Sequence, residues 1–115
     1  MKITALLAEN KPILSFEVFP PKTESGFDSV RTATEEIAAL HPAFMSVTYG
    51  AGGGTSAYTL DIAENIKARY GVPTLAHLTC VSSTHETVRE RIAAIRSRGI
   101  ENVMALRGAV PPEVR

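Results

Sequence analysis

The sequence contains a single cysteine, no tryptophan and no excess of charge of either sign. Because Cys80 stands alone, an internal disulfide is impossible and a zinc site that needs two thiolates is excluded. Twelve Lys and Arg residues balance twelve Asp and Glu residues, and beyond four arginines between residues 89 and 98 the basic side chains do not cluster. The sequence therefore predicts no metal site, no nucleic-acid partner and no membrane partner.

Long hydrophobic runs are also missing. The longest apolar stretch near the start, residues 5–8, is too short for the core of a signal peptide and far too short to span a bilayer. Together with the single cysteine, this predicts a cytoplasmic protein. Hydrophobic residues make up 44% of the chain and charged residues 21%, a composition typical of a globular domain rather than a disordered segment.

Segments rich in branched and aromatic side chains recur along the chain and are typical of β-strands. They cover residues 13–19, 44–49, 74–80 and 102–107, with an amphipathic helical pattern in each interval. Strands that alternate with helices, at a repeat of about 30 residues, predict right-handed βαβ units on a parallel sheet with helices on one face.

The three helices are marked by start signals and by apolar stripes. Ser25 followed by Asp28 predicts the start of the first helix, and Ser83 followed by Glu86 predicts the start of the third. The predicted stripes are Val30, Ala33, Ile37 and Leu40; Ile62, Ile66 and Tyr70; and Val88, Ile92 and Ile95, with Pro42, Gly71 and Gly99 as stops.

The number of βα units is half of what a closed barrel requires. A (β/α)₈ barrel takes roughly 250 residues, so residues 1–115 are predicted to be a single partial domain, the N-terminal three and a half units of such a barrel. An open flavodoxin-type sheet is the alternative, but residues 20–22 read Pro-Pro-Lys where that fold places a phosphate loop. The remaining chain, or a partner in a homo-oligomer, is expected to close the open edges.

Strand alternation predicts one polar side chain near the end of each strand on the face that lines the barrel interior. These are Glu17, Thr48, His77 and Arg107, and catalytic groups of such barrels gather at that rim. Three of them also have a plain structural interpretation: Glu17 as an edge charge against aggregation, His77 as a structural histidine and Arg107 as a partner in a surface ion pair. Residues 50–54 are rich in glycine but match neither common nucleotide motif, so they indicate only backbone freedom beside a flat ligand.

Four ordered motifs then point to a known family. They are SFEVFPPK at 15–22, SVTYGAG at 46–52, AHLTC at 76–80 and ALRG at 105–108. In order and spacing they resemble the first four strand ends of methylenetetrahydrofolate reductase. The resemblance implies a flavin-bearing (β/α)₈ barrel, with FAD as cofactor and NAD(P)H as co-substrate, that reduces 5,10-methylenetetrahydrofolate to 5-methyltetrahydrofolate.

The resemblance also assigns roles to residues. Glu17 resembles the acid of the family, which protonates the leaving nitrogen of the folate. It must stay protonated near neutral pH, which burial among Phe16, Phe19 and a bound flavin would favour. By the same resemblance, further residues line the flavin and nicotinamide site or contact the cofactor. They are Thr48, Tyr49, Ala51, His77, Arg107, Gly108 and Ala109.

One of these positions departs from the family. Ala109 stands where the family usually has an aspartate that serves both flavin and pterin. Two other functions therefore stay open. The first is a non-catalytic binding or assembly protein derived from this barrel, with Ala109 as the mark of lost catalysis. The second is a flavin-free barrel enzyme that uses Glu17 and His77 as acid and base.

Overall fold

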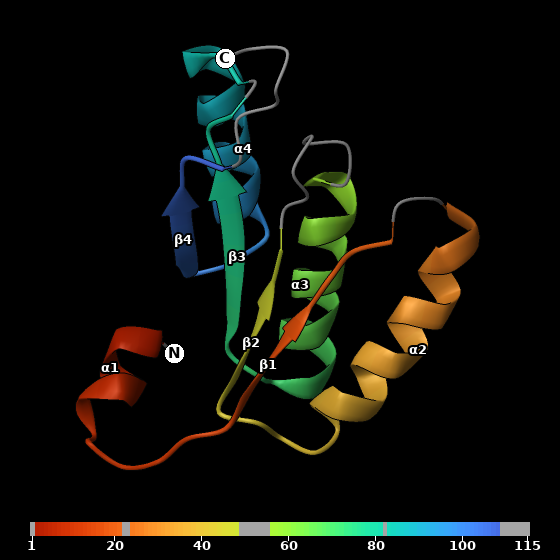
Figure 1. The fold of residues 1–115 in the computed structure, drawn as a ribbon, viewed down its shortest axis with the longest axis vertical. Coiled ribbons are helices and arrows are strands. Elements are labelled where there is room, and N and C mark those ends of the chain that lie inside the picture. Colours follow the sequence, from red (N-terminus) through yellow and green to blue (C-terminus); the bar gives the residue numbers. More distant parts are fainter. Residues whose placement is uncertain (1, 22–23, 49–55, 82, 109–115) are drawn as a thin grey trace.

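The structure of the protein is a computed structural model, which describes residues 2–21, 24–48, 56–81 and 83–108. Its centre is a four-stranded parallel sheet with the strands in sequential order (Figure 1). The strands are β1 (Ser15–Val18), β2 (Phe44–Val47), β3 (Thr74–Thr79) and β4 (Asn102–Leu106). All four predicted strands are therefore confirmed, with somewhat shorter bounds than the sequence predicted.

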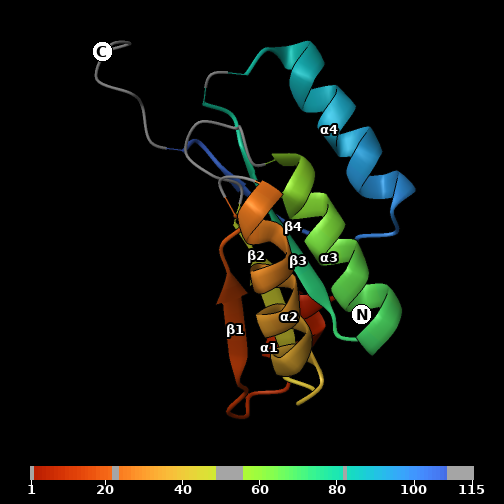
Figure 2. The same ribbon diagram turned by 90° about the vertical axis from the view of Figure 1, so that its right-hand side faces the viewer.

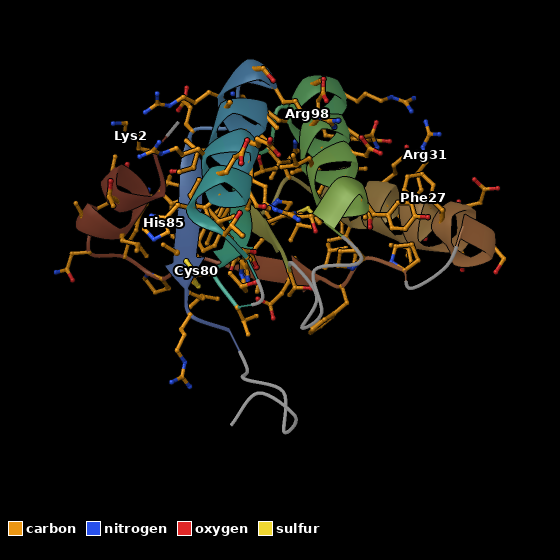
Figure 3. The ribbon with its side chains drawn as sticks, turned by 90° about the horizontal axis from the view of Figure 1, so that it is seen from above. Lys2, Phe27, Arg31, Cys80, His85 and Arg98 are labelled. Carbon is orange, nitrogen blue, oxygen red and sulfur yellow. The ribbon has the colours of Figure 1, made fainter. Side chains whose placement is uncertain are left out.

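Helices alternate with these strands and lie along one face of the sheet (Figures 2 and 3). A 3-10 turn, η1 (Glu24–Gly26), leads into α2 (Phe27–Ala38), and α3 (Ser56–Tyr70) and α4 (His85–Ser97) follow. The protein is thus an α/β structure with the arrangement of the first half of a (β/α)₈ barrel, as predicted. None of the helices in the described residues is long and apolar enough to cross a membrane.

The core lies between the sheet and the helices. Met45 and Val47 of β2 and Ala76 of β3 are fully buried there, and they meet Ile62 and Ile66 of α3. Burying one such aliphatic side chain stabilises a fold by about 1.5–3 kcal/mol. Packing against α3 therefore holds the middle of the sheet. Among the described residues, no helix packs on the opposite face (Figure 2).

A short first helix, α1 (Ile3–Ala8), was not predicted. Its first amide, the N–H of Ile3, donates to Oδ1 of Asn102 at 2.9 Å, and Nδ2 of Asn102 donates to the carbonyl of Thr74 at 3.2 Å. These bonds join α1 to the amino ends of β4 and β3 (Figure 1). A helix of six residues is marginal by itself, so these contacts with distant residues support it.

Two predicted helix starts were wrong by a short distance. In α2 the N-cap is Gly26, without a side-chain cap bond, because the 3-10 turn includes Ser25 and delays the helix. In α4 the N-cap is Thr84 rather than Ser83, and its Oγ1 accepts the N–H of Thr87 at 3.1 Å. Neighbouring hydroxyl residues offer alternative caps, and only the backbone geometry selects one of them.

The predicted glycine stops are confirmed. Gly71 and Gly99 follow α3 and α4 with φ values of 66° and 71°, in the left-handed region that ends helices. The predicted stripe of α2 is wrong at its end, because the helix ends at Ala38 and Leu40 lies beyond it, 75% exposed.

Candidate functional site

The candidate site lies on the face of the sheet opposite α2, α3 and α4, which we call the open face. Partners in parallel register project to the same face of a sheet, and Glu17 pairs with Ser46, which in turn pairs with Leu75. Two residues further along β3, His77 shares this face and pairs with Met104 of β4. The predicted grouping of Glu17 and His77 on one face is therefore confirmed by the register.

The carboxyl group of Glu17 in β1 contacts one side chain of β2 and one of β3. Its Oε1 accepts a hydrogen bond from Oγ of Ser46 at 3.2 Å, and Nε2 of His77 lies 3.5 Å from the same oxygen. The Glu17 side chain is 47% exposed, whereas that of His77 is 12% exposed. Both contacts reach one oxygen, so within the described residues Oε2 remains the atom of Glu17 that is available to a ligand.

Two buried polar atoms of β3 on the open face have no hydrogen-bond partner within the described residues. They are Nε2 of His77, whose contact with Glu17 lacks hydrogen-bond geometry, and Oγ1 of Thr79. Thr79 is 7% exposed and lies two residues after His77, so its side chain shares the open face. An unpaired buried polar group costs about 1–3 kcal/mol, which a ligand with complementary polar atoms would recover.

The end of β2 is fixed by two hydrogen bonds to the backbone of Thr48. The N–H of Thr48 donates to the carbonyl of Val18 at 3.0 Å, and the Thr48 carbonyl accepts Oγ1 of Thr59 at 2.7 Å. Thr48 itself is partly buried at the carboxyl end of the strand. The other two residues predicted here, Tyr49 and Ala51, lie outside the described residues, as do residues 50–54 of the glycine-rich turn.

Arg107 does not share the face of Glu17 and His77, contrary to the prediction from strand alternation. His77 pairs with Met104, and Leu78 pairs with Ala105, so alternation along β4 puts Arg107 on the side of the helices. Its side chain is exposed just after β4, with Nε 3.4 Å from the carbonyl of Gly108. β4 carries apolar residues on both faces, which is why its sequence did not reveal the correct parity.

Gly108 is required by its surroundings. Its φ is +86°, and a Cβ built there would lie 2.7 Å from Cγ1 of Val81 and 3.1 Å from Cβ of Thr79. The sequence argument expected a ligand to approach this backbone. In the structure the close approach is to side chains at the end of β3. Ala109, the next predicted position, lies outside the described residues.

The expected burial of Glu17 is only partly met. Phe16 packs against the core on the helix side, so it lies on the face opposite Glu17, and Phe19 is 68% exposed. The described residues therefore leave Glu17 open to solvent. Ser46 is the contact that sequence analysis missed: alternation places it on the same face, but Thr48 was chosen as the polar residue of that strand.

A parallel sheet in sequential order, with helices on one face and polar side chains toward the strand ends on the other, is the arrangement of one half of a (β/α)₈ barrel. Comparison with known proteins identifies the family. The profile of methylenetetrahydrofolate reductase matches residues 2–115. The chain therefore belongs to the methylenetetrahydrofolate reductase family.

Individual relatives carry the same name. The chain is 41% identical to the "Probable methylenetetrahydrofolate reductase (NADH)" of Oryza sativa subsp. japonica over 110 residues. This aligned region covers 96% of this chain and 18% of the relative. It is 38% identical over 100 residues to the 5,10-methylenetetrahydrofolate reductase of Pectobacterium carotovorum, with 87% of this chain and 34% of the relative covered. For the Escherichia coli protein of that name, identity is 37% over 99 residues, with 86% and 33% covered. The chain thus spans 34% or less of the length of these relatives.

Proposed function

We propose that the protein containing this chain reduces 5,10-methylenetetrahydrofolate to 5-methyltetrahydrofolate, with FAD as cofactor and NAD(P)H as the source of hydride. Family membership supports the reaction, and the name of the rice relative includes NADH. The observation that carries the proposal is the half-exposed carboxyl of Glu17 on the open face, beside His77. It supplies an acid where a ligand has access.

Glu17 acts as the general acid in this proposal. The methylene carbon of the folate bridges two nitrogens, and it accepts hydride only after one carbon–nitrogen bond opens. The leaving nitrogen must then receive a proton, which a positioned carboxylic acid provides. Oε2 of Glu17 is the oxygen without a contact in the described residues, so it is the atom that delivers this proton.

The residues of the open face fit a flavin. The unpaired Nε2 of His77 and Oγ1 of Thr79 are buried polar atoms that match the polar edge of a flat heteroaromatic ring. Bound FAD would supply the hydride, received from NAD(P)H, that reduces the methylene carbon. Thr48 and His77 would line this ring at the strand ends, and the family resemblance adds Tyr49, Ala51 and Ala109.

Arg107 and Gly108 fit a different part of the cofactor. The register directs Arg107 away from Glu17, and its exposed guanidinium lies just beyond the strand ends. A guanidinium is suited to phosphate oxygens, so we assign Arg107 to the anionic groups of FAD rather than to the ring. Gly108 lets the backbone after β4 pass close to the end of β3, and this fixes the position of the Arg107 backbone from which the guanidinium extends.

The open face and the strand edges require a cover. The relatives are longer than this chain, so further strands of the same polypeptide are the cover we propose, with residues 1–115 as part of one barrel domain. Closure by a second copy of the chain is the alternative. The exposed thiol of Cys80 suits the reducing cytoplasm, which we propose as the location.

The test replaces Glu17 by Gln in the full natural protein, which keeps the size of the side chain and removes the acid. Reduction of bound flavin by NADH or NADPH should stay nearly unchanged. Reduction of the folate should fall by about 10² to 10⁴-fold, the usual contribution of a positioned general acid. Glu36→Gln, at an exposed position of α2, is the matched control. Equal losses in both half-reactions would mean that Glu17 is structural and would refute its assignment as acid.

A second candidate is a flavin-free enzyme that uses Glu17 and His77 as acid and base. The 3.5 Å separation between Oε1 of Glu17 and Nε2 of His77 favours it. Absorbance of the purified full protein near the flavin bands, with and without added FAD, separates the two. A colourless protein that does not take up FAD supports the second candidate.

A further inference from the structure

The two contacts of Glu17 differ in kind although they reach the same oxygen. Oγ of Ser46 donates a hydrogen bond to Oε1 at 3.2 Å, whereas Nε2 of His77, at 3.5 Å, makes an electrostatic contact without hydrogen-bond geometry. Ser46 is therefore the residue in the described part of the chain that fixes the orientation of the carboxyl group.

The position of the Ser46 hydroxyl is itself fixed by the core. Ser46 is 8% exposed, and its neighbours in β2, Met45 and Val47, are both fully buried on the helix side. Register places Ser46 directly beside Glu17 across the β1–β2 ladder. A hydroxyl on such a rigid strand can hold a carboxyl group in one orientation with little loss of side-chain freedom.

Burial alone does not explain this bond. Thr74 and Thr79 are also buried hydroxyl residues of the same sheet, and their Oγ1 atoms have no hydrogen-bond partner within the described residues. Ser46 differs because its hydroxyl meets a half-exposed carboxyl group at an accessible face. The pairing is therefore a specific feature of the site rather than a general property of hydroxyls in this sheet.

We propose that Ser46 is a positioning residue for Glu17: its hydroxyl holds Oε1, so that the proton given to the folate nitrogen leaves from Oε2. This inference rests on the proposed reductase function. When the O–H bond at Oε2 breaks and the N–H bond forms on the leaving nitrogen, the negative charge spreads over both carboxylate oxygens. A hydrogen bond to a charged acceptor is stronger than one to a neutral acceptor, so Ser46 stabilises the carboxylate as it forms.

The test uses Ser46→Ala, Ser46→Cys and Ser46→Thr in the full natural protein with FAD bound. Ala and Cys remove the hydroxyl, and Cys keeps a side chain of similar size whose S–H is a weak donor. Folate reduction should fall about 10-fold in both variants, the lower range for losing a bond to a charged group. Its pH midpoint should move to higher pH, because the carboxylate loses a donor. Reduction of flavin by nicotinamide should not change.

The Thr variant keeps the hydroxyl and should recover most of the rate and the original pH midpoint. Ser15→Ala is the matched control, because Ser15 lies two residues before Glu17 on the same face of β1 and is exposed. A folate rate and pH midpoint that stay unchanged in Ser46→Ala and Ser46→Cys would overturn the inference. So would equal losses in both half-reactions without a shift of the midpoint, because that pattern indicates a purely structural role.

Failure of the inference is distinguishable from failure of the proposed function. If Glu17→Gln abolishes folate reduction while the Ser46 variants behave as wild type, the acid assignment stands and positioning by Ser46 is refuted. If Glu17→Gln leaves folate reduction intact, the acid assignment itself is refuted, and the positioning role falls with it.

Discussion

The two faces of the sheet differ in how far their side chains are buried. On the helix side, Met45, Val47 and Ala76 are completely buried under α3 and its neighbours. On the open face, Met104 is 42% exposed and the Glu17 side chain is 47% exposed. One face stabilises the fold by burying apolar surface, and the other presents side chains to whatever occupies the barrel interior.

Polar groups differ between the two sides in the same way. In the helix layer, Oε1 of Glu35 accepts bonds from Asn65 at 3.1 Å and Arg69 at 3.2 Å, which join α2 to α3. Arg98, the C-cap residue of α4, donates from Nη1 to Oδ1 of Asp61 in α3 at 2.6 Å. On the open face, Nε2 of His77 and Oγ1 of Thr79 stay unpaired within the described residues. The polar groups that join the helices are thus paired with one another. Oγ1 of Thr74 on the helix side is also unpaired within the described residues, so unpaired buried hydroxyls occur on both faces of the sheet, and the open face differs in its exposed carboxyl group and the imidazole beside it.

The largest expected effect tests the difference in burial. Ile66→Ala removes a fully buried side chain of α3 and should lower the free energy of unfolding by about 2–5 kcal/mol. Met104→Ala, on the open face, should lower it by less than about 1 kcal/mol. Urea unfolding of both variants in residues 1–115, without the further strands that we propose as the cover, measures the contrast. An equal loss at Met104 there would mean that the open face is already buried, for example against a second copy of the chain.

A second prediction compares two glycines with positive φ. A Cβ at Gly71, after α3, would have no heavy atom within 4 Å, whereas at Gly108 it would lie 2.7 Å from Val81. Gly71→Ala should cost about 1–2 kcal/mol, the backbone penalty of the left-handed region. Gly108→Ala should cost clearly more, because Val81 must also move. Similar losses of unfolding free energy in both variants would mean that the rim near Gly108 adjusts freely.

Much of the fold was predictable because its signals are local. Branched and aromatic runs separated by Gly or Pro located the four strands, and the handedness of βαβ units then gave their order. The short helix α1 was not predicted from the sequence, because the hydrogen bond that supports it comes from Asn102, far along the chain. The predicted stripes were wrong at Ala33, Leu40 and Ile92, which are exposed, because the exact ends and rotation of a helix depend on the sheet beneath it.

The site was predictable only as far as strand parity could be read. β1 and β3 each contain one ionisable side chain, and alternation placed these two, Glu17 and His77, on one face. In β4 residues 103–106 are apolar on both faces, so the side of Arg107 followed only from the register with β3. The hydrogen bond from Ser46 to Glu17 could be found only from the interatomic distance in the structure. Alternation puts both Ser46 and Thr48 on the face of Glu17 and does not say which of them contacts it.

A third prediction compares a Thr→Val substitution at an unpaired and at a paired hydroxyl. The change in the free energy of unfolding should have opposite signs at the two positions. Thr79→Val removes an Oγ1 that has no partner within the described residues, so it should raise the free energy of unfolding by about 1 kcal/mol without a ligand. Thr59→Val is the matched control: its Oγ1 bonds the carbonyl of Thr48 at 2.7 Å, so its loss should destabilise by about 1–2 kcal/mol. Thermal unfolding without cofactor measures both. A loss of stability in Thr79→Val would indicate that this hydroxyl already has a partner, such as ordered water.

The smallest expected effect concerns pH and the helix layer. Hydrogen bonds from Asn65 and Arg31, with the charge of Arg69 nearby, lower the pKa of Glu35 from its ordinary value of 4.5. A carboxyl group whose pKa is lower in the folded state stabilises the fold above the unfolded value and loses this contribution as pH falls through the folded value. Wild-type protein should therefore lose an increment of stability below about pH 4.5 that Glu35→Gln lacks. Urea unfolding from pH 7 downward should show the two proteins converging in acid, with Glu36→Gln as a control for the general effect of charge. A stability difference that stays constant with pH would mean that the bonds between α2 and α3 at Glu35 do not favour its charged form.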